Sequence, residues 1–342
     1  MKKALLCFLC ACFTLNTFSA CNRNAEKEIP QLYIATSTGD LGARDGYATD
    51  ESVIYGLYEA GFRYIDFSMY GFSAQHPYMQ AGWEAKILHL KTVADTLGMK
   101  FVQAHSEGGN PLSSDESEVE RLIQATVRSL EICEILGIEN TVVHAGYQEG
   151  LSKEEWFEKN KLFYDRLLPF AEDCGVNILC ENSTRVNMGD NYYINSGADM
   201  REFIKYVNNP YFHGCWDTGH GNCEGEQYDD IVALGDEMYA IHYNDNSGYS
   251  DAHLMPYCGT LDQDAVMKAL IEIGYSGYFT LEATGGMRSQ YSWSGPEFPI
   301  MTETYPYIPK EQCPMLLDRM QQEKLLYQAM EDLLIKYNML AN

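Results

Sequence analysis

Eight short apolar runs recur along the chain, most of them separated by stretches with helical periodicity. Each run is almost continuously apolar, as expected for strands that are buried on both faces of a parallel sheet. Several helical stretches end in a glycine just before the next run, which is typical of helix C-termini. The predicted strands are residues 31–36, 64–69, 100–105, 140–145, 177–182, 212–217, 238–244 and 278–283.

Helical patterns lie between and after these strands. The clearest helical patterns span residues 82–97, 116–136, 153–174, 263–273 and 310–339. Eight strand–helix repeats predict an α/β fold, a (β/α)8 TIM barrel that forms a single domain over residues 31–342. An open doubly wound sheet is the alternative. The sequence disfavours it, because no Gly-x-Gly-x-x-Gly motif follows the first strand.

The N-terminal residues have the pattern of an export signal. Residues 1–20 begin with two lysines after the methionine and continue as an apolar run, which predicts a secretory signal peptide. The sequence Phe-Ser-Ala-Cys at 18–21 matches a bacterial lipobox, so we expect a lipid on Cys21 and a polar tether over 21–30. An ordinary signal peptide or an uncleaved anchor is the alternative. We therefore expect an envelope lipoprotein, periplasmic or in the outer membrane, which contacts the membrane only through this anchor.

The charge of the chain argues against a polyanionic partner. There are 49 acidic residues against 24 lysines and arginines, and the net charge is −25. A surface of this sign repels DNA and RNA, so we expect no nucleic acid partner.

The cysteines beyond position 21 do not suggest a disulfide framework. They number seven and are irregularly spaced, which favours buried free thiols. A bridge from Cys215 or Cys223 to Cys258 stays open.

Polar residues with metal-binding side chains stand at or just after the ends of six of the predicted strands. In a barrel, the C-terminal strand ends meet at one mouth, so these side chains become neighbours. Imidazole and carboxylate groups together suit Mn, Zn, Co, Fe or Mg. The residues concerned are His105, His144, Glu181, Asp217, His220, His242, Asp251, His253 and Glu282.

The segment at 214–222, Gly-Cys-Trp-Asp-Thr-Gly-His-Gly-Asn, places two of these residues three apart. We expect Asp217 to leave its strand toward the mouth. Because Gly219 and Gly221 flank His220, we expect a sharp turn, rather than a helix, to bring the imidazole into the same pocket. A helix-capping aspartate and a buried, hydrogen-bonded histidine are the simpler alternative for each residue taken singly.

Four motifs in the second half of the chain resemble those of the xylose isomerase-like TIM barrel superfamily. The resemblance covers about residues 31–290. This superfamily contains sugar phosphate isomerases and epimerases, inosose dehydratases and type IV AP endonucleases, also called AP endonuclease family 2. The motifs are Cys-Glu-Asn-Ser at 180–183, Trp-Asp-Thr-Gly-His at 216–220, His-Tyr-Asn-Asp at 242–245 and Leu-Glu-Ala-Thr at 281–284.

The resemblance to the ketose epimerases implies a site with one divalent ion, Mn, Zn, Co or Mg. Its ligands would be Glu181, Asp217, His242 and Glu282. The two glutamates would also be catalytic and move protons on opposite faces of a sugar, and His220 would touch a substrate oxygen. We therefore expect a sugar isomerase, epimerase or related lyase that transfers a proton next to a carbonyl of a free sugar or keto-glycoside. The arginine usual after the strand-seven histidine is absent.

Two other functions stay open. The resemblance to the AP endonucleases implies up to three zinc ions on all nine residues, with His105, His144, His220, Asp251 and His253 as additional ligands or substrate contacts, in a multi-zinc phosphoesterase. A non-catalytic lipoprotein could instead bind sugar at the barrel mouth, aided by the aromatic residues of the loop at 285–309. In either case the partner is a small molecule, and the sequence does not specify the oligomeric state.

Overall fold

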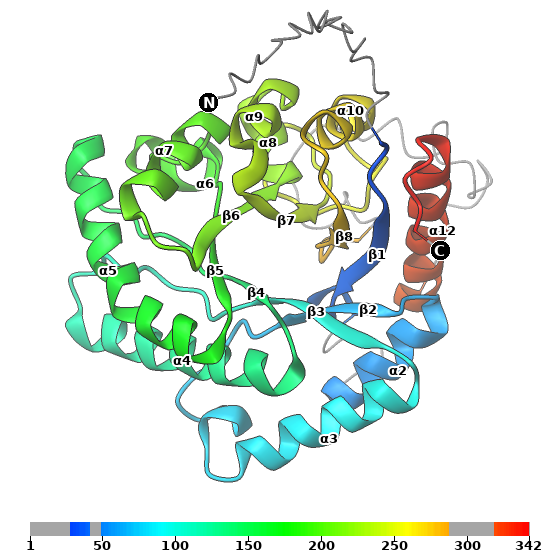
Figure 1. Ribbon diagram of the computed structural model, residues 1–342, viewed down its shortest axis with the longest axis horizontal. Helices are drawn as coiled ribbons and strands as arrows, with labels where there is room; N and C mark the ends of the chain where they lie inside the picture. The colour runs from blue at the N-terminus through cyan, green and yellow to red at the C-terminus, as the bar shows by residue number, and fades with distance from the viewer. Residues whose placement is uncertain (1–27, 42–48, 287–317, 342) are drawn as a thin grey trace, which may run out of the picture.

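The computed structural model describes residues 28–41, 49–286 and 318–341. Eight parallel strands close into a barrel in sequence order, and β8 pairs with β1 (Figure 1). The predicted TIM barrel is therefore confirmed. The strands are β1 (Leu32–Ser37), β2 (Tyr64–Ser68), β3 (Lys100–His105), β4 (Asn140–Val142), β5 (Asn177–Glu181), β6 (Phe212–Asp217), β7 (Met238–Tyr243) and β8 (Gly277–Leu281).

The helices pack around the outside of the barrel (Figure 1). Within the described residues, each of the five predicted helical stretches contains a helix, and four further helices of seven or more residues follow β1, β5 and β6. The nine helices of seven or more residues in the described part are α2 (Asp50–Ala60), α3 (Trp83–Thr96), α4 (Glu116–Leu136), α5 (Lys153–Cys174), α7 (Gly197–Val207), α8 (Thr218–Glu224), α9 (Tyr228–Leu234), α10 (Gln263–Ile273) and α12 (Arg319–Lys336).

Local signals in the sequence explain where the long helices begin and end. At the start of α5, the Ser152 and Glu155 side chains each accept a hydrogen bond from the other's backbone N–H, a capping box. Gly137 and Gly175 end α4 and α5 with φ of 78° and 67°. Residues with a Cβ rarely adopt this left-handed conformation, which is why glycine stands there.

Two regions of apolar packing hold the barrel together. The large core lies between the strands and the surrounding helices. A smaller cluster of Val142, Leu179, Cys215 and Ala240 comes from four adjacent strands. Because side chains alternate along a strand, Leu179 shares the inner face of β5 with Glu181, and Cys215 shares that of β6 with Asp217. This cluster therefore lies beneath the site residues inside the barrel.

The C-terminal helix α12 lies beside β1 and α2 (Figure 1). It buries Leu326, Met330, Leu333 and Leu334, as expected for barrel packing. None of the helices in the described part of the chain is both long and apolar enough to span a bilayer.

Several sequence expectations fall on residues that the structure does not describe. The signal peptide, the lipid site at Cys21 and most of the tether lie outside the described residues, and so do most of the loop at 285–309 and the start of the helix at 310–339. The six cysteines in the described part beyond position 21 are free thiols, so no bridge joins Cys215 or Cys223 to Cys258.

Candidate metal centre

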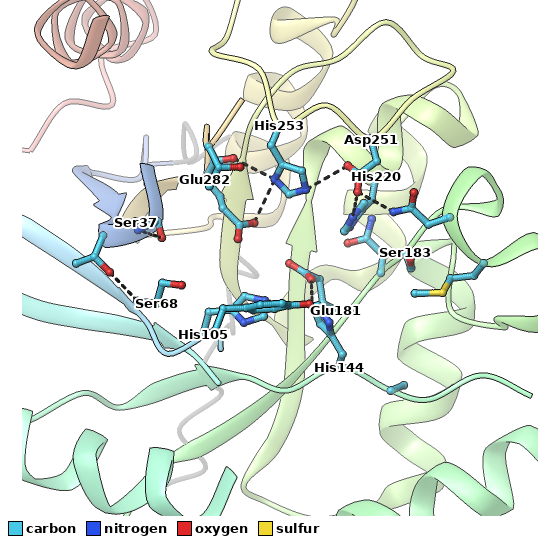
Figure 2. Close-up of a pocket in the computed structure, with 18 of the residues that line it drawn as sticks. Ser37, Ser68, His105, His144, Glu181, Ser183, His220, Asp251, His253 and Glu282 are labelled. Atoms are coloured by element: carbon cyan, nitrogen blue, oxygen red, sulfur yellow. Dashed lines mark hydrogen bonds and ion pairs between the residues drawn. The ribbon is translucent and has the colours of Figure 1, made fainter. Parts of the chain in front are cut away.

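A cavity of about 600 Å³ opens at the C-terminal ends of the strands (Figure 2). Seven of the nine predicted site residues line it: His105, His144, Glu181, His220, Asp251, His253 and Glu282. The other two, Asp217 and His242, are fully buried. The structure thus brings all nine residues to the barrel mouth, as the sequence predicts.

Four of them form a central cluster. Glu181, Asp217, His242 and Glu282 each offer one ligand atom, and these atoms all lie within 4.8 Å of one another. The His242 Nδ1 atom is 2.5 Å from Glu181 Oε1 and 3.2 Å from Glu282 Oε2. Three carboxylates and one imidazole on rigid strand ends form a donor set that suits a divalent cation.

Asp217 is held in place through all of its polar groups. Its backbone N–H donates to Asn182 Oδ1, and Asn182 Nδ2 donates to its carbonyl oxygen. One carboxylate oxygen accepts a 2.6 Å hydrogen bond from the backbone N–H of His220, and the other accepts from Asn244 Nδ2 at 2.7 Å. Asp217 therefore also caps α8, which is the simpler alternative that the sequence offered for this residue.

The expectation of a sharp turn at 217–222 is wrong, because α8 begins directly after Asp217. The helix carries His220 into the cavity on its first turn. The glycines serve close packing instead. A Cβ on Gly219 would lie 1.9 Å from Asn244 Oδ1, and one on Gly221 would lie 2.5 Å from Gln227 Oε1. Glycine costs helix stability, but here it gives neighbouring side chains room.

A second group joins the central cluster at Glu181. The His144 Nε2 atom is 2.8 Å from Glu181 Oε2 and 3.1 Å from His105 Nε2. The other ring nitrogen of His105, Nδ1, donates to the Ser106 carbonyl oxygen at 2.9 Å. This hydrogen bond leaves the lone pair of His105 on Nε2, where it faces His144 and the cavity.

A third group lies on the loop after β7 and on α8 (Figure 2). His220, Asp251 and His253 offer ligand atoms within 4.8 Å of one another. The His220 Nε2 atom is 3.1 Å from Asp251 Oδ2, and His253 Nε2 is 3.2 Å from Asp251 Oδ1. Despite this proximity, Asp251 Oδ1 and His220 Nδ1 have no hydrogen-bond partner among the described residues. A cation is one partner that would satisfy such atoms.

The charges of the site are strongly coupled. Burial raises the pKa of Glu282 to about 7. Burial, together with the neighbouring His144, lowers the pKa of His105 to about 3. Burial also disfavours the charged form of His220, but the carboxylates of Asp217 and Asp251 outweigh it and raise its pKa to about 10. Without a cation, His220 and part of Glu282 therefore hold protons among the crowded carboxylates, whereas His105 stays neutral.

The structure adds site residues that the sequence motifs do not reveal. Asn182 and Asn244 hold Asp217, and the buried Asp66 contacts His242. Tyr70 lines the cavity beside the His105 ring. One signal was available, because Asp66 is the only charged residue of β2 and lies two residues before that strand ends.

Curated proteins with detectable sequence similarity are distant from this chain. An uncharacterized protein of Methanocaldococcus jannaschii is 28% identical over 181 residues, which are 51% of this chain and 60% of that protein. A mannonate dehydratase of Thermotoga petrophila is 27% identical over 143 residues, which are 38% of this chain and 39% of that enzyme. The chain thus spans about three fifths of the first relative and two fifths of the second.

Solved structures share the fold over more of the chain. A D-tagatose 3-epimerase-like protein has a TM-score of 0.66 at 18% identity, covering 90% of this chain and 98% of its own. An IolI protein with a bound zinc atom has the same score and identity, covering 90% and 99%. A 3-keto-D-glucoside 4-epimerase from E. coli has a TM-score of 0.59 at 18% identity, covering 74% and 92%.

The family is shown by the sequence itself. The sequence profile described as xylose isomerase-like TIM barrel matches residues 56–295, which is more than half of the chain. The matched region includes all nine residues at the barrel mouth. The chain therefore belongs to the xylose isomerase-like TIM barrel family.

Proposed function

We propose that this protein is a divalent-metal-dependent enzyme that isomerises, epimerises or dehydrates a sugar by proton transfer next to a carbonyl. The observation that carries the proposal is the central cluster, in which Glu181 and Glu282 border the cavity while Asp217 and His242 are buried beneath it. A bound divalent ion would polarise the carbonyl and so acidify the adjacent C–H bond.

The two glutamates are the proposed acid and base. They come from β5 and from the end of β8, and both contact His242 Nδ1, so their carboxylates converge from different strands. One carboxylate takes the proton from the substrate carbon. In an epimerisation or isomerisation the other returns a proton to the same or the neighbouring carbon, and in a dehydration it protonates the hydroxyl on the β-carbon, which leaves as water. Proton transfer by carboxylates positioned in this way is general acid–base catalysis.

The lining of the cavity favours a neutral substrate. Its uncharged polar side chains can hydrogen-bond sugar hydroxyls: Ser37, Thr38, Thr49, Ser68, Asn182, Ser183, Asn187 and Thr284. No lysine or arginine lines the cavity in the part of the chain that the structure describes. A phosphate group would ordinarily be bound by such cations. The substrate class is therefore a free sugar or a keto-glycoside, in keeping with the epimerase names among the similar structures.

The test is hydrogen exchange at the substrate carbon in heavy water. Glu181→Gln and Glu282→Gln are expected to abolish exchange of a substrate C–H, while elemental analysis still finds the metal. Glu224→Gln is the matched control, because Glu224 binds Thr184 and Arg185 outside the cavity lining and should leave exchange intact. Full exchange in both variants of the site would overturn the proposal.

A multi-zinc phosphoesterase is the second candidate, and one observation favours it. Beyond the central cluster, two further groups of potential ligands lie at the same mouth, His105 with His144 and His220 with Asp251 and His253. Two or three zinc ions per chain, together with hydrolysis of a model phosphodiester, would select this function. Tight sugar binding without any exchange or hydrolysis would instead select a non-catalytic binding protein.

We also propose that the chain is exported and lipid-anchored through Cys21. The lipobox sequence at 18–21 supports this. Metabolic labelling with a radioactive fatty acid should mark the wild-type protein and not a Cys21→Ala variant. Equal labelling of both would exclude this anchor.

A further inference from the structure

A buried carboxylate faces His242 on the side away from the central cluster. Asp66 lies on the inner face of β2, and both side chains are almost completely excluded from solvent. The Asp66 Oδ2 atom is 3.2 Å from His242 Nε2. The other ring nitrogen, Nδ1, faces Glu181 and Glu282. The His242 imidazole therefore lies between Asp66 and the other proposed metal ligands.

Asp66 belongs to a hydrogen-bond chain that crosses the barrel interior. Thr280 Oγ1 donates to Gln103 Oε1 at 3.1 Å, and Gln103 Nε2 donates to Asp66 Oδ2 at 3.2 Å. These three side chains and that of His242, which come from β8, β3, β2 and β7, are all buried. The direction of this chain makes Oδ2 an acceptor, so His242 Nε2 must be the donor toward it.

A buried carboxylate is costly unless it is paired and hydrogen-bonded. The only cationic partner of Asp66 among the described residues is His242, and its second oxygen, Oδ1, has no hydrogen-bond partner there. The surroundings of Asp66 thus offer little reason for a charge except its contact with this one imidazole. An amide or an apolar side chain would fill the space at lower cost.

We propose that Asp66 is a positioning residue that fixes His242 as a metal ligand. By accepting a hydrogen bond from Nε2, it keeps that nitrogen protonated and directs the Nδ1 lone pair toward Glu181, Asp217 and Glu282. Carboxylates that bind the far nitrogen of a ligating histidine orient the ring and strengthen it as a donor. The inference rests on the metal centre of the proposed function.

The experiment measures Co²⁺ affinity of the full chain by competition with a chromophoric chelator, and it records the visible absorption of the bound ion. Asp66→Leu removes the acceptor and is expected to weaken the first equivalent of Co²⁺ 10- to 100-fold. Asp66→Asn keeps an oxygen but loses the charge, so we expect about a tenfold loss and an altered absorption band. If the Asp66→Leu variant does not fold, the near-isosteric Asp66→Asn variant tests the positioning role in its place.

Two controls separate positioning from general damage. Thr280→Val removes the far end of the hydrogen-bond network and keeps the shape of a side chain that neighbours His242 across β7 and β8, so the Asp66–His242 contact is retained. Its affinity should stay within about threefold of wild type. In a His242→Ala background, either Asp66 substitution should change affinity less than about threefold, because the residue acts through the imidazole. An equal loss in both backgrounds, or no loss in the wild-type background, overturns the inference.

The outcomes also distinguish this inference from the proposed function. If wild-type protein binds Co²⁺ and both Asp66 variants bind it equally well, the positioning role falls while the proposed function stands. If Asp66 governs affinity but the wild-type protein exchanges no substrate proton, the positioning role stands and the proposed chemistry falls. A wild-type chain that binds no Co²⁺, Zn²⁺ or Mn²⁺ overturns both.

Discussion

The Nε2 atoms of His105 and His144 lie 3.1 Å apart, and hydrogen bonds alone cannot satisfy both of these atoms together with the neighbouring Glu181 carboxylate. His105 donates through Nδ1 to the Ser106 carbonyl, so its Nε2 can only accept. His144 Nε2 also lies 2.8 Å from Glu181 Oε2. One N–H cannot point at both acceptors. A cation among the three atoms would satisfy all of them.

We predict that this pair binds a second ion beside the central one. His105→Ala and His144→Ala should each remove one equivalent of metal and leave the ion on the central cluster. The measurement is elemental analysis of chain purified without chelator. His89→Ala is the control, because His89 is an exposed histidine paired with Glu51 on the barrel exterior. A single ion per wild-type chain that both variants retain would exclude the second site.

Metal affinity should rise with pH between about 5 and 8. The metal-free chain holds protons on His220, whose pKa is raised to about 10, and on part of Glu282, whose pKa is raised to about 7. A cation needs the deprotonated forms, so its binding must release protons, and rising pH removes this competition. Below pH 7 Glu282 becomes mostly protonated, and affinity should fall further.

Calorimetry in two buffers of different ionisation enthalpy counts the released protons. Glu282→Gln should release fewer protons at pH 6.5 than wild type, because the amide carries no titrating proton. Binding that is independent of pH in wild-type protein would contradict the protonated states of His220 and Glu282.

The strands and the site could be read from the sequence for one physical reason. In a closed parallel barrel, every strand is buried on both faces, so it appears as an apolar run. Each run ends where the chain reaches the mouth, and a polar residue there stands out. Glu181 and Asp217 end their strands, and Glu282 follows β8 directly, as predicted. The observed strand ends differ from the predicted ones by at most a few residues.

Apart from the meeting of strand ends at the mouth, specific contacts between residues far apart in the chain could not be predicted from the sequence. The helix α8 contains three glycines or asparagines in its seven residues, and local propensity argues against it. Its stability comes from the Asp217 cap and from packing against Asn244 and Gln227, which no local pattern reveals. Asp66 was missed for the same reason, because its partner His242 is 176 residues away.

Gly219→Ala should weaken metal binding although residue 219 carries no ligand. The added methyl would lie 1.9 Å from Asn244 Oδ1 and must displace that buried side chain. Asn244 Nδ2 donates to Asp217. Displacing Asn244 therefore removes a hydrogen bond that positions the Asp217 carboxylate, a proposed metal ligand. We expect a 10- to 100-fold loss of metal affinity, comparable to the loss of other residues that orient ligands.

The control for this substitution is Gly39→Ala at another glycine of the cavity lining. There the nearest atom to a new Cβ is Ser37 Oγ at 3.3 Å, so the crowding is much smaller. Metal affinity of this variant should stay close to that of wild type. Unchanged affinity in Gly219→Ala as well would show that Asn244 does not position Asp217.

The loop after β2 should depend on one buried carboxylate for its stability. Glu107 accepts hydrogen bonds of 2.6 Å from the backbone N–H groups of Gly71 and Phe72, and Arg121 pairs with it at 3.0 Å. Only 8% of the Glu107 side chain is exposed. Its removal leaves two backbone donors without an acceptor and leaves Arg121 with Glu118 as its remaining carboxylate partner. Glu107→Ala should therefore lower the free energy of unfolding by about 2–4 kcal/mol.

Glu118→Ala provides the matched comparison, since Glu118 pairs with the same Arg121 but is 45% exposed. An exposed ion pair contributes little, so this variant should lose less than about 1 kcal/mol when both variants are unfolded in urea and compared with wild type. The two variants also differ in their effect on the cavity. Tyr70 precedes the anchored residues and packs against the His105 ring at 5.2 Å, so only Glu107→Ala should release it from the cavity wall. Equal losses in both variants would mean that Arg121, and not the loop anchor, accounts for the stability.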